Sequence, residues 1–448
     1  MTVKLFGTDG IRGTANQYPI TADIALKFGK AAGHYFKKHG YRNRVVIAKD
    51  TRLSGYMIEP ALTAGFISVG MDVILVGPMP TPSVPMLIKS LRADLGVMIS
   101  ASHNPYEDNG LKLFNSEGFK LTDNVEAEIE NLILNHNLNE YLTTPEDLGR
   151  AKRLDDAPGR YIEHVKRSLP KGLSLAGLRI VLDCANGAAY HLAPTIFWEL
   201  GAEVIKIGTE PNGFNINQGC GSTHPEFLKQ KVLETRADLG IALDGDADRV
   251  IMCDEKGHII AGDHLIAIIA KSMQEQGALS SNKIVVTHMS NGALDEFCNK
   301  NGLEVIRAQI GDRYVSEQMR VNNINLGGEQ SGHIILSDYS TTGDGMIAGL
   351  QVLAYMVNTK KKMSKIGEIF DLYPQLLKNV KYKNSNPLEN KALGKKLEEM
   401  QAALKDCRVL IRKSGTEKLV RIMVEGKDKA RIKDVVGELE SLIASNCN

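Results

Sequence analysis

Short apolar runs and polar loops alternate along most of the chain in a repeated order. An apolar run ends at a polar loop, a helical pattern follows, and a second apolar run comes after it. The order occurs three times, beginning at RVVIAKDTR (44–52), LRIVLDCANG (178–187) and NKIVVTHMSNG (282–292). Strand, loop, helix and strand in this succession form the unit of a parallel sheet that is covered on both faces. The pattern therefore predicts three related α/β domains in tandem.

The end of the chain has a different pattern. A charged helical pattern runs from about Leu388 to Leu404, and two apolar runs follow it, RVLIR (408–412) and LVRIMVE (419–425). A last amphipathic helical pattern closes the chain. These elements predict a small α+β domain, and the segment Ile366–Lys381 is the best candidate for the linker before it.

Together the patterns predict an α/β fold, with three tandem related α/β domains that have mixed sheets and a C-terminal small α+β domain. We place the domain boundaries at 1–153, 154–254, 255–368 and 369–448. A chain of 448 residues suits this division, because a domain takes roughly 100–200 residues.

Composition and charge mainly argue against several classes of protein. The chain is 43% hydrophobic and 24% charged, with a formal net charge of +1, so no global field favours nucleic acid or an acidic membrane surface. No apolar run suits a signal peptide or a membrane span. The six cysteines are scattered without a CxxC pair, which argues against a disulfide framework or a zinc site. We therefore expect a reduced, cytoplasmic protein.

The first candidate site is GVMISASHNPYEDNG (96–110), where an apolar strand runs into a polar turn. Strand ends of α/β sheets are where ligands and catalytic groups collect, and Ser102 and His103 lie there next to each other. A serine hydrolase is not favoured, because no G-x-S-x-G elbow is near. Taken alone, the pair is also typical of an ordinary polar turn.

The second candidate site is DLGIALDGDADRVIM (238–252), in which Asp244, Asp246 and Asp248 alternate directly after an apolar run. Alternate residues of an extended segment point the same way, and three like charges repel unless a cation lies between them. Oxygen ligands indicate a hard ion and favour Mg²⁺. The alternative is a calcium EF-hand loop, but Arg249 stands where that loop needs glycine.

Three further glycine-containing loops carry polar side chains. NLGGEQSGHI (325–334) presents Glu329, Ser331 and His333, which suit the hydroxyls of a polyol. IRKSGTEKLVR (411–421) offers backbone amides, hydroxyls and guanidinium groups, a combination that binds phosphate. The N-terminal FGTDGIRGT (6–14) carries Thr8 and Arg12 and could reach another phosphate or the loop of Ser102. By itself, the first of these loops is equally typical of a plain glycine turn, and the second of a hairpin with solvated charges.

Taken together and in order, these loops resemble the α-D-phosphohexomutase superfamily along the whole chain. The motifs that carry the resemblance are FGTDGIRG, ISASHNPYEDNG, DGDADR, GGEQSGH and RKSGTE. NINQGCGSTHP (215–225) and TTGDG (341–345) resemble its amino-sugar branch more than the mannose or glucose branch. The chain departs from the expected pattern at Lys418, where many relatives have proline, and at Gln309, where lysine is expected. Gln309 puts in doubt a cationic group in the specificity loop of the third domain.

The resemblance implies four domains around a central cleft, each giving one loop. It implies that Ser102 carries phosphate as phosphoserine, and that Asp244, Asp246 and Asp248 hold one Mg²⁺ together with that phosphate. Glu329 and Ser331 would bind sugar hydroxyls with His333 nearby. The phosphate that does not react would be bound by Arg412, Ser414, Gly415, Thr416 and Arg421.

Four more residues are candidates for the chemistry itself. Arg12 and Arg249 are candidate cations for the transition state, because phosphoryl transfer depends mainly on positioning and charge. His103 and Lys112 are candidate general acid and base groups, being close to the carrier in the sequence. The residues alone do not decide which of the two moves the proton.

The implied activity is that of an isomerase, an intramolecular phosphotransferase that interconverts glucosamine 6-phosphate and glucosamine 1-phosphate through a bisphosphate intermediate. It would feed the synthesis of UDP-N-acetylglucosamine and of peptidoglycan precursors. Glucosamine 1,6-bisphosphate or a similar bisphosphate is the implied activator, and a kinase or a bisphosphate would prime Ser102. We expect a small-molecule sugar phosphate as partner, no nucleic acid and no membrane, with a homodimer as a candidate assembly.

Three other functions stay open at this point. A phosphomannomutase or phosphoglucomutase would use the same loops for a different sugar. A metal-dependent sugar phosphatase would pass the phosphoryl group to water. A non-catalytic sugar-phosphate sensor is less favoured, because the carrier, metal and phosphate loops are all present.

Overall fold

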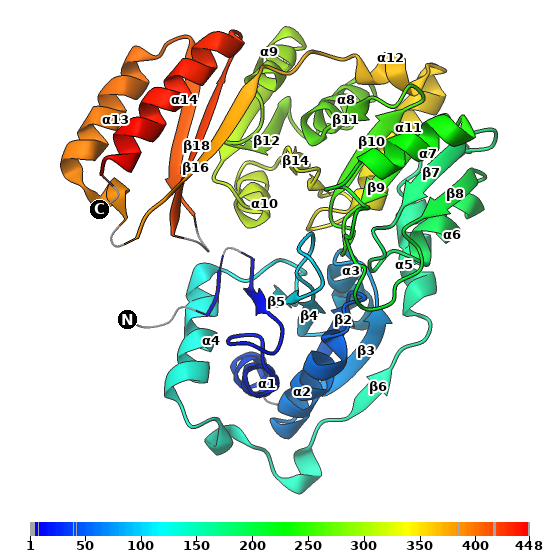
Figure 1. Ribbon diagram of the computed structural model, residues 1–448. Coiled ribbons are helices and arrows are strands. Elements are labelled where there is room, and N and C mark those ends of the chain that lie inside the picture. The colour runs from blue at the N-terminus through cyan, green and yellow to red at the C-terminus, as the bar shows by residue number, and fades with distance from the viewer. Residues whose placement is uncertain are drawn as a thin grey trace. The chain divides into compact units, whose positions relative to one another are not determined.

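The computed structural model describes residues 5–7, 9–38, 40–41, 43–383, 386–414 and 418–446 (Figure 1). The chain divides into two compact units. The first unit comprises Met1–Thr287 and Leu303–Ile369, and the second comprises His288–Gly302 and Phe370–Asn448. The second unit is therefore built from two stretches of chain that are separated in the sequence.

The first sheet carries the Ser102 loop. Its six strands lie in the order β1-β5-β4-β2-β3-β6. Strand β2 pairs in parallel with β3 and β4, whereas β5 runs antiparallel to β4 and to β1. The strands are β1 (Ile11–Thr14), β2 (Arg44–Lys49), β3 (Asp72–Pro78), β4 (Leu95–Ile99), β5 (Asp108–Asn115) and β6 (Ala151–Arg153). The helices are α1 (Ala22–Phe36), α2 (Gly55–Ser68), α3 (Ser83–Leu91) and α4 (Asp123–Asn135).

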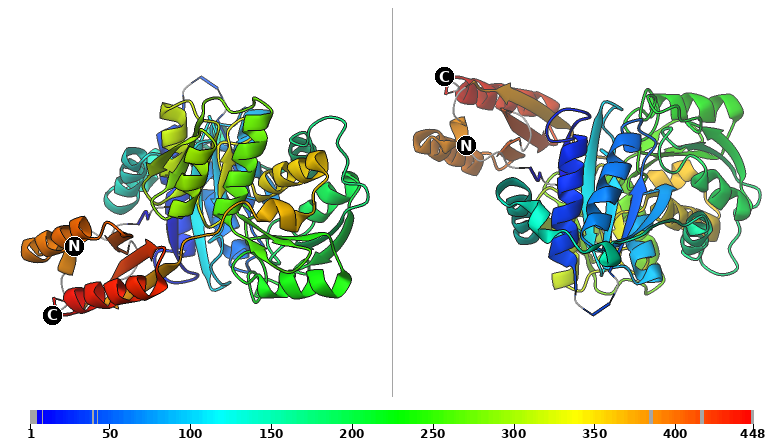
Figure 2. Two further views of the ribbon diagram at one scale, coloured as in Figure 1. Left: turned by 90° about the horizontal axis from the view of Figure 1, so that it is seen from above. Right: turned by 90° about the horizontal axis from the view of Figure 1, so that it is seen from below.

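Helices α1 and α2 lie side by side against this sheet (Figure 2). Gly29 and Gly65 make the close approach possible, because a methyl group added to Gly29 would come within 2.6 Å of the Leu62 carbonyl oxygen. Phe28 and Phe66 are fully buried in the same core. This dense core fixes the strand ends from which the Ser102 loop emerges.

The second sheet carries the aspartate loop and has the order β11-β10-β9-β7-β8. Strands β9 and β10 are antiparallel, with Leu243 opposite Val250, so the aspartate loop is the connection between them. The strands are β7 (Arg179–Asp183), β8 (Glu203–Ile207), β9 (Leu239–Leu243), β10 (Val250–Asp254) and β11 (Ile259–Ile260). The helices of this region are α5 (Ala157–Lys166), α6 (Leu192–Glu199) and α7 (Glu226–Thr235).

The third sheet has the order β13-β12-β14-β15, again with parallel and antiparallel neighbours. Its strands are β12 (Lys283–Thr287), β13 (Glu304–Ala308), β14 (Leu326–Gly328) and β15 (Ile334–Leu336). Its helices are α8 (Gly262–Glu275), α10 (Asp312–Val321), α11 (Gly345–Thr359) and α12 (Met363–Gly367). The loop with Glu329 and Ser331 connects β14 to β15.

The second unit is a three-stranded antiparallel sheet, β16-β18-β17, with three helices among its described residues. The strands are β16 (Gln375–Lys381), β17 (Cys407–Lys413) and β18 (Leu419–Gly426), and the helices are α9 (Gly292–Lys300), α13 (Lys391–Ala403) and α14 (Lys429–Ala444). The Arg408 guanidinium binds both Glu425 oxygens, each at 3.0 Å. It also donates to the carbonyls of His288, at 2.8 Å, and Ser290, at 2.6 Å. These bonds attach the segment before α9 to the sheet.

The predicted fold class is confirmed: three α/β domains with mixed sheets precede a small α+β domain. The predicted linker was too long, because Gln375–Lys381 form β16 and pair with β18 along their whole length. The domain boundaries and the central cleft stay predictions.

Two expectations from composition can be compared with the described residues. The described cysteines are all free, and Cys184, Cys220, Cys253 and Cys298 are buried. None of the described helices is both long enough and apolar enough to cross a bilayer.

Candidate active site

Ser102 lies at the first turn of the loop between β4 and β5 and is 1% exposed. Its φ of 52° is in the left-handed region, which non-glycine residues adopt at an energetic cost. The Ser102 hydroxyl donates a hydrogen bond of 2.6 Å to Asp244 Oδ2, and His103 Nδ1 is 3.4 Å from the same hydroxyl. Two motifs that are distant in the sequence therefore meet at one oxygen atom.

The three aspartates gather in a turn, not along a strand. Strand β9 ends at Leu243, and the backbone then turns, with Ala247 at a φ of 57°. The expectation of an extended segment was wrong, because the tight antiparallel connection to β10 leaves no length for a strand. The turn nevertheless brings one oxygen each of Asp244, Asp246 and Asp248 within 4.8 Å of one another.

This cluster fits a hard divalent cation. All three side chains are buried, and the Oδ1 atoms of Asp246 and Asp248 have no hydrogen-bond partner among the described residues. Buried carboxylate oxygens without partners are costly unless a cation binds them. A set made only of carboxylate oxygens suits Mg²⁺.

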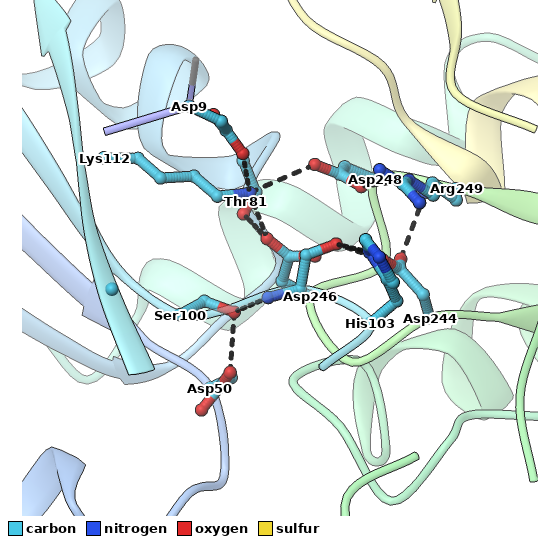
Figure 3. A network of polar contacts seen from close by, with 12 residues as sticks. Asp9, Asp50, Thr81, Ser100, His103, Lys112, Asp244, Asp246, Asp248 and Arg249 are labelled. Atoms are coloured by element: carbon cyan, nitrogen blue, oxygen red, sulfur yellow. Dashed lines mark hydrogen bonds and ion pairs between the residues drawn. The ribbon is translucent and has the colours of Figure 1, made fainter. Parts of the chain in front are cut away.

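The second oxygen of two of these aspartates is occupied (Figure 3). Lys112 donates to Asp246 Oδ2 at 2.7 Å and to Asp248 Oδ2 at 3.3 Å. The Thr81 hydroxyl also donates to Asp246 Oδ2. Lys112 and Thr81 thus orient two carboxylates so that their Oδ1 atoms remain available to a metal.

Lys112 belongs to a closed ring in which acidic and basic side chains alternate. Neighbouring members lie within ion-pair distance, in the order Asp9, Lys112, Asp248, His333, Asp312 and Lys120, and Lys120 contacts Asp9 again. The ring joins residues from all three α/β domains, so it fixes the position of Asp248 from two sides.

Among the basic members of the ring, His333 is the one whose side chain is readily neutral near pH 7. Burial lowers its pKa, but Asp248 and Asp312 outweigh burial and raise it. Against this, the Gly343 amide donates to His333 Nε2 at 3.0 Å. A backbone N–H can only donate, so Nε2 must be unprotonated. We therefore assign the neutral form with its proton on Nδ1, which faces Asp248 Oδ1 at 3.6 Å.

Burial and neighbouring charges shift the pKa values of Asp244 and Asp248 in opposite directions. Burial, with repulsion from Asp248 and Asp246, holds the pKa of Asp244 well above its usual range. Burial would also raise the pKa of Asp248, but the Lys112 ammonium, the Nδ1–H of His333 and the Arg249 guanidinium hold it well below the usual range. A cation bound among the three carboxylates would offset the repulsion that contributes to the raised pKa of Asp244.

The pKa values of the two candidate acid–base groups, His103 and Lys112, shift in opposite directions. Burial, with the nearby cations Arg249 and Arg12, lowers the pKa of His103 to about 4. Burial disfavours the charged form of Lys112 as well, but Asp246, Asp9 and Asp248 prevail and raise its pKa. His103 is therefore neutral near pH 7, whereas Lys112 is a fixed cation.

The two candidate transition-state cations flank this cluster. The Arg12 side chain pairs with Asp9. The Arg249 amide donates to Asp244 Oδ1 at 3.2 Å, and its Nε lies 3.9 Å from Asp248 Oδ1. Both arginines are thus held by carboxylates near the Ser102 loop.

The candidate sugar loop connects β14 to β15. The isolated bridge between Arg249 and His333 joins it to the aspartate loop. The Gly311 amide donates to Glu329 Oε1 at 3.3 Å, and burial raises the pKa of Glu329. The Ser331 hydroxyl is buried without a hydrogen-bond partner in the described part of the chain. Glu329 and Ser331 are therefore placed to bind a polar ligand, whereas His333 is already engaged in the ring.

The candidate phosphate loop belongs to the second unit. Arg412 and Arg421 are opposite each other on β17 and β18 and line a surface cavity of about 150 Å³. Burial and the Arg421 guanidinium lower the pKa of Arg412, so an anion between them would relieve the repulsion. Ser414 is 2% exposed, and its amide donates to the Leu419 carbonyl at 2.9 Å. Gly415 and Thr416 lie outside the described residues, as does Thr8.

Four residues of this site were not predicted from the sequence. Asp9 lies inside the motif FGTDG and Asp312 inside IGDRY, and a polar residue in a glycine turn was the available signal for both. Thr81 and Lys120 had no such signal, since a lone hydroxyl or lysine is usually solvated.

Comparison with known proteins places the chain in a family. Models of the four domains of the phosphoglucomutase/phosphomannomutase family match it in order. They match as α/β/α domain I at residues 3–140, domain II at 159–257, domain III at 261–373 and the C-terminal domain at 377–442. The chain belongs to this family of phosphohexomutases, which is an isomerase family.

Its similar curated relatives are phosphoglucosamine mutases. The phosphoglucosamine mutase of Parvibaculum lavamentivorans is 57% identical over 447 residues, covering 100% of both chains. That of Granulibacter bethesdensis is also 57% identical, covering 98% of this chain and 96% of its own.

Solved structures agree on the fold. A phosphoglucomutase/phosphomannomutase family protein from Burkholderia thailandensis has a TM-score of 0.82 at 23% identity, covering 99% of this chain and 97% of its own. An N-acetylphosphoglucosamine mutase from Aspergillus fumigatus, solved with GlcNAc-6P and magnesium, has a TM-score of 0.68 at 18% identity. The latter covers 100% of this chain and 96% of its own.

Proposed function

We propose that this chain is a phosphoglucosamine mutase, which interconverts glucosamine 6-phosphate and glucosamine 1-phosphate. The observation that carries the proposal is the 2.6 Å hydrogen bond from the Ser102 hydroxyl to a buried cluster of three aspartates. A hydroxyl beside a cation-demanding cluster suits a phosphate carrier, since a bound cation offsets the charge of the transferring group. The relatives favour glucosamine phosphates over mannose or glucose phosphates.

The reaction would pass through a bisphosphate. The O6 hydroxyl of glucosamine 1-phosphate attacks the phosphorus of phosphorylated Ser102. A P–O6 bond forms while the bond from phosphorus to Ser102 Oγ breaks, the O6 proton leaves, and Ser102 Oγ takes up a proton. Glucosamine 1,6-bisphosphate then turns round in the site and returns its other phosphoryl group to Ser102. The reverse proton movements accompany that step, and glucosamine 6-phosphate is released.

We assign the proton transfer at the sugar hydroxyl to His103. Its Nδ1 lies 3.4 Å from the carrier oxygen, and its imidazole is neutral near pH 7, as the group that receives the proton must be. Lys112 is a poor base, because carboxylates on several sides hold its proton. Its proposed part is to orient Asp246 and Asp248 and to supply fixed positive charge.

The remaining residues would bind and orient the substrate. We assign Arg249 and Arg12 to the oxygens of the transferring phosphoryl group, because both are cations beside the Ser102 loop. Glu329 and Ser331 would bind sugar hydroxyls. Arg412, Ser414, Gly415, Thr416 and Arg421 would hold the phosphate that does not react.

Asp244, Asp246 and Asp248, with the Ser102 phosphate, would hold Mg²⁺, which when bound offsets negative charge on the transferring oxygens. A bisphosphate activator, priming of Ser102 by a kinase or a bisphosphate, a homodimer, a cytoplasmic location and a role in peptidoglycan precursor synthesis stay predictions. The structure of the Aspergillus fumigatus enzyme with GlcNAc-6P and magnesium supports the choice of ligands.

Replacing the carrier tests the proposal directly. The Ser102→Ala variant should have no mutase turnover, and its intact mass should not rise by one phosphate after incubation with glucosamine 1,6-bisphosphate, whereas the wild type should gain one. Side-by-side kcat/KM values for glucosamine, mannose and glucose phosphates decide the sugar. Full turnover by Ser102→Ala would refute the carrier, and accumulation of free phosphate would indicate a phosphatase.

A further inference from the structure

Arg52, just after β2, is a fully buried arginine that binds the Ser102 loop with nearly every donor it has. It is 1% exposed. Its Nη2 donates to the carbonyls of Ser102 and Asn104, each at 2.9 Å. Its Nη1 donates to the carbonyls of Pro105 and Asp108. Its Nε donates to Asp50 Oδ2 at 2.7 Å. A guanidinium has five N–H donors, so these contacts use all of them.

Asn217, from the second α/β domain, binds the same two carbonyl oxygens. Its side-chain amide donates to Ser102 O at 2.9 Å and to Asn104 O at 3.0 Å. Asn217 is 5% exposed and has a φ of 58°, and its own amide donates to the Ala185 carbonyl at 2.9 Å. Each of the two carbonyl oxygens therefore accepts from both Arg52 and Asn217, which fills both lone pairs.

The aspartate loop packs on this same point. A methyl group added to Gly245 would lie 2.5 Å from the Ser102 carbonyl oxygen and 2.9 Å from Asn217 Nδ2. Gly245 lies between Asp244 and Asp246, so the close approach sets the distance between the aspartate turn and the Ser102 backbone. The Ser102 loop is thus held from its own domain, from Asn217 and from the aspartate turn at once.

Asp50 holds the other side of the loop. Its Oδ2 accepts from the Ser100 hydroxyl at 2.6 Å, and Ser100 Oγ in turn accepts from the Ser102 amide at 2.9 Å. Both the amide and the carbonyl of Ser102 are therefore fixed by buried side chains. This accounts for the left-handed backbone of Ser102, which turns its hydroxyl toward Asp244.

We propose that Arg52 and Asn217 are positioning residues for phosphoryl transfer. They act jointly on the carbonyls of Ser102 and Asn104 and hold the carrier oxygen against the aspartate cluster. The inference rests on the proposed carrier role of Ser102. Neither residue touches the reacting atoms, and their effect is on the geometry in which transfer takes place.

The test compares Arg52→Lys and Asn217→Ser in the full-length chain. Lysine keeps the charge but has three donors on a single nitrogen, so it cannot reproduce the fork. Both proteins are phosphorylated with glucosamine 1,6-bisphosphate and mixed with glucosamine 1-phosphate in a single-turnover experiment. We expect the transfer rate at saturation to fall on the order of 10²-fold, while the half-saturating concentration stays within about twofold, because the substrate's own contacts are unchanged.

Val73→Ala is the matched control. Val73 is fully buried in the core of the first sheet, and its truncation lowers stability without touching the Ser102 loop. Its transfer rate per folded molecule should equal that of the wild type. If Arg52→Lys does not fold, Asn217→Ser carries the test alone.

The outcomes separate the inference from the proposed function. If the wild type transfers no phosphoryl group, the carrier role itself is wrong. If the wild type transfers it and both variants match Val73→Ala, Arg52 and Asn217 serve folding only and the inference is overturned. In the double variant, the fold-decrease in the transfer rate should be smaller than the product of the two single fold-decreases, since both side chains donate to the same two oxygens. Losses that multiply would overturn the joint action.

Discussion

At the scale of single residues, the two oxygens of one carboxylate in the aspartate cluster have different contacts. Asp246 shows this most clearly: Lys112 and Thr81 donate to its Oδ2, and its Oδ1 has no hydrogen-bond partner among the described residues. One oxygen is thus used to set the orientation, and the other is left for a cation. Removing the charge of this side chain should weaken metal binding more than it lowers the stability of the fold.

Asp246→Asn should therefore weaken Mg²⁺ binding at least about tenfold, because affinity for hard cations follows the number of charged ligands. Turnover should fall with it. Titration calorimetry with Mg²⁺ on the phosphorylated protein measures the affinity, and thermal unfolding checks that the fold persists. An unchanged affinity would remove Asp246 from the metal site.

The buried cysteines are a second residue-scale case. Burial raises the pKa of Cys220, Cys253 and Cys298 to about 12, and burial holds the pKa of Cys184 well above its usual range. The thiolate is the reactive form. These four thiols should therefore resist iodoacetamide in mildly alkaline buffer in the native protein and react after unfolding, as followed by peptide mass spectrometry. Rapid native labelling of any of them would contradict the described burial.

At the scale of elements, close packing explains the segment TTGDG. The Gly343 amide donates to His333, and the Gly345 amide donates to the Ala247 carbonyl at 3.0 Å. A methyl group added to Gly343 would lie 2.6 Å from His333 Nε2 and 2.7 Å from the Asp248 carbonyl oxygen. The segment therefore supports the aspartate turn from behind, and Gly343 leaves no room for a side chain.

Gly343→Ala should lower stability by about 1–3 kcal/mol through overpacking, and it should lower turnover by displacing the aspartate turn. The matched control is Gly159→Ala in α5, where an added methyl group meets nothing among the described residues. The control should be neutral or slightly stabilising, because alanine is the better helix former. Thermal unfolding and steady-state rates of both variants decide the matter. Equal behaviour of the two would refute the packing argument.

The elements themselves were largely predictable, because their signals are local. The runs that begin at 44, 178 and 282 form β2, β7 and β12, and the tail has two strands and two helices in the predicted order. The segment QLLKNVK resembles a linker because it exposes leucines and lacks a regular alternation, although it forms β16. Its pairing with β18 is a non-local contact that the segment alone does not encode.

The site was predictable only in part, for the same reason. Ser102 and the aspartates stood out because each motif concentrates polar groups at a strand end. Arg52 and Asn217 did not, since a single arginine or asparagine gives no sign of the carbonyls it will meet. Asp9, Lys120 and Asp312 acquire their place only when the first and third α/β domains come together.

At the scale of the whole molecule, an ion pair inside the second unit connects the two stretches of chain from which that unit is built. Arg408 binds Glu425 through two nitrogens and also holds the carbonyls before α9, and the Gly292 amide donates to Glu425 Oε1 at 2.9 Å. Glu425 is 2% exposed. The carboxylate therefore links the start of α9 to the sheet.

Arg408→Ala should loosen this link. Hydrogen exchange of the amides in 288–302 should accelerate by at least about tenfold, because each lost bond to a charged group is worth about 1.5–3 kcal/mol. Amides of α14, which packs elsewhere on the sheet, should keep their protection. Mass spectrometry of exchanged peptides makes the comparison. Unchanged exchange in 288–302 would show that α9 is held by other contacts.

The division of the chain into two units limits where the protein can be truncated. Because residues 288–302 belong with residues 370–448, the polypeptide passes from one unit to the other three times. A truncation before residue 370 would not deliver a clean three-domain protein, since it would remove the sheet to which the start of α9 and the segment before it are hydrogen-bonded. Producing either unit alone would require this internal stretch to be excised or rejoined, and a lone C-terminal fragment would lack one of its own helices.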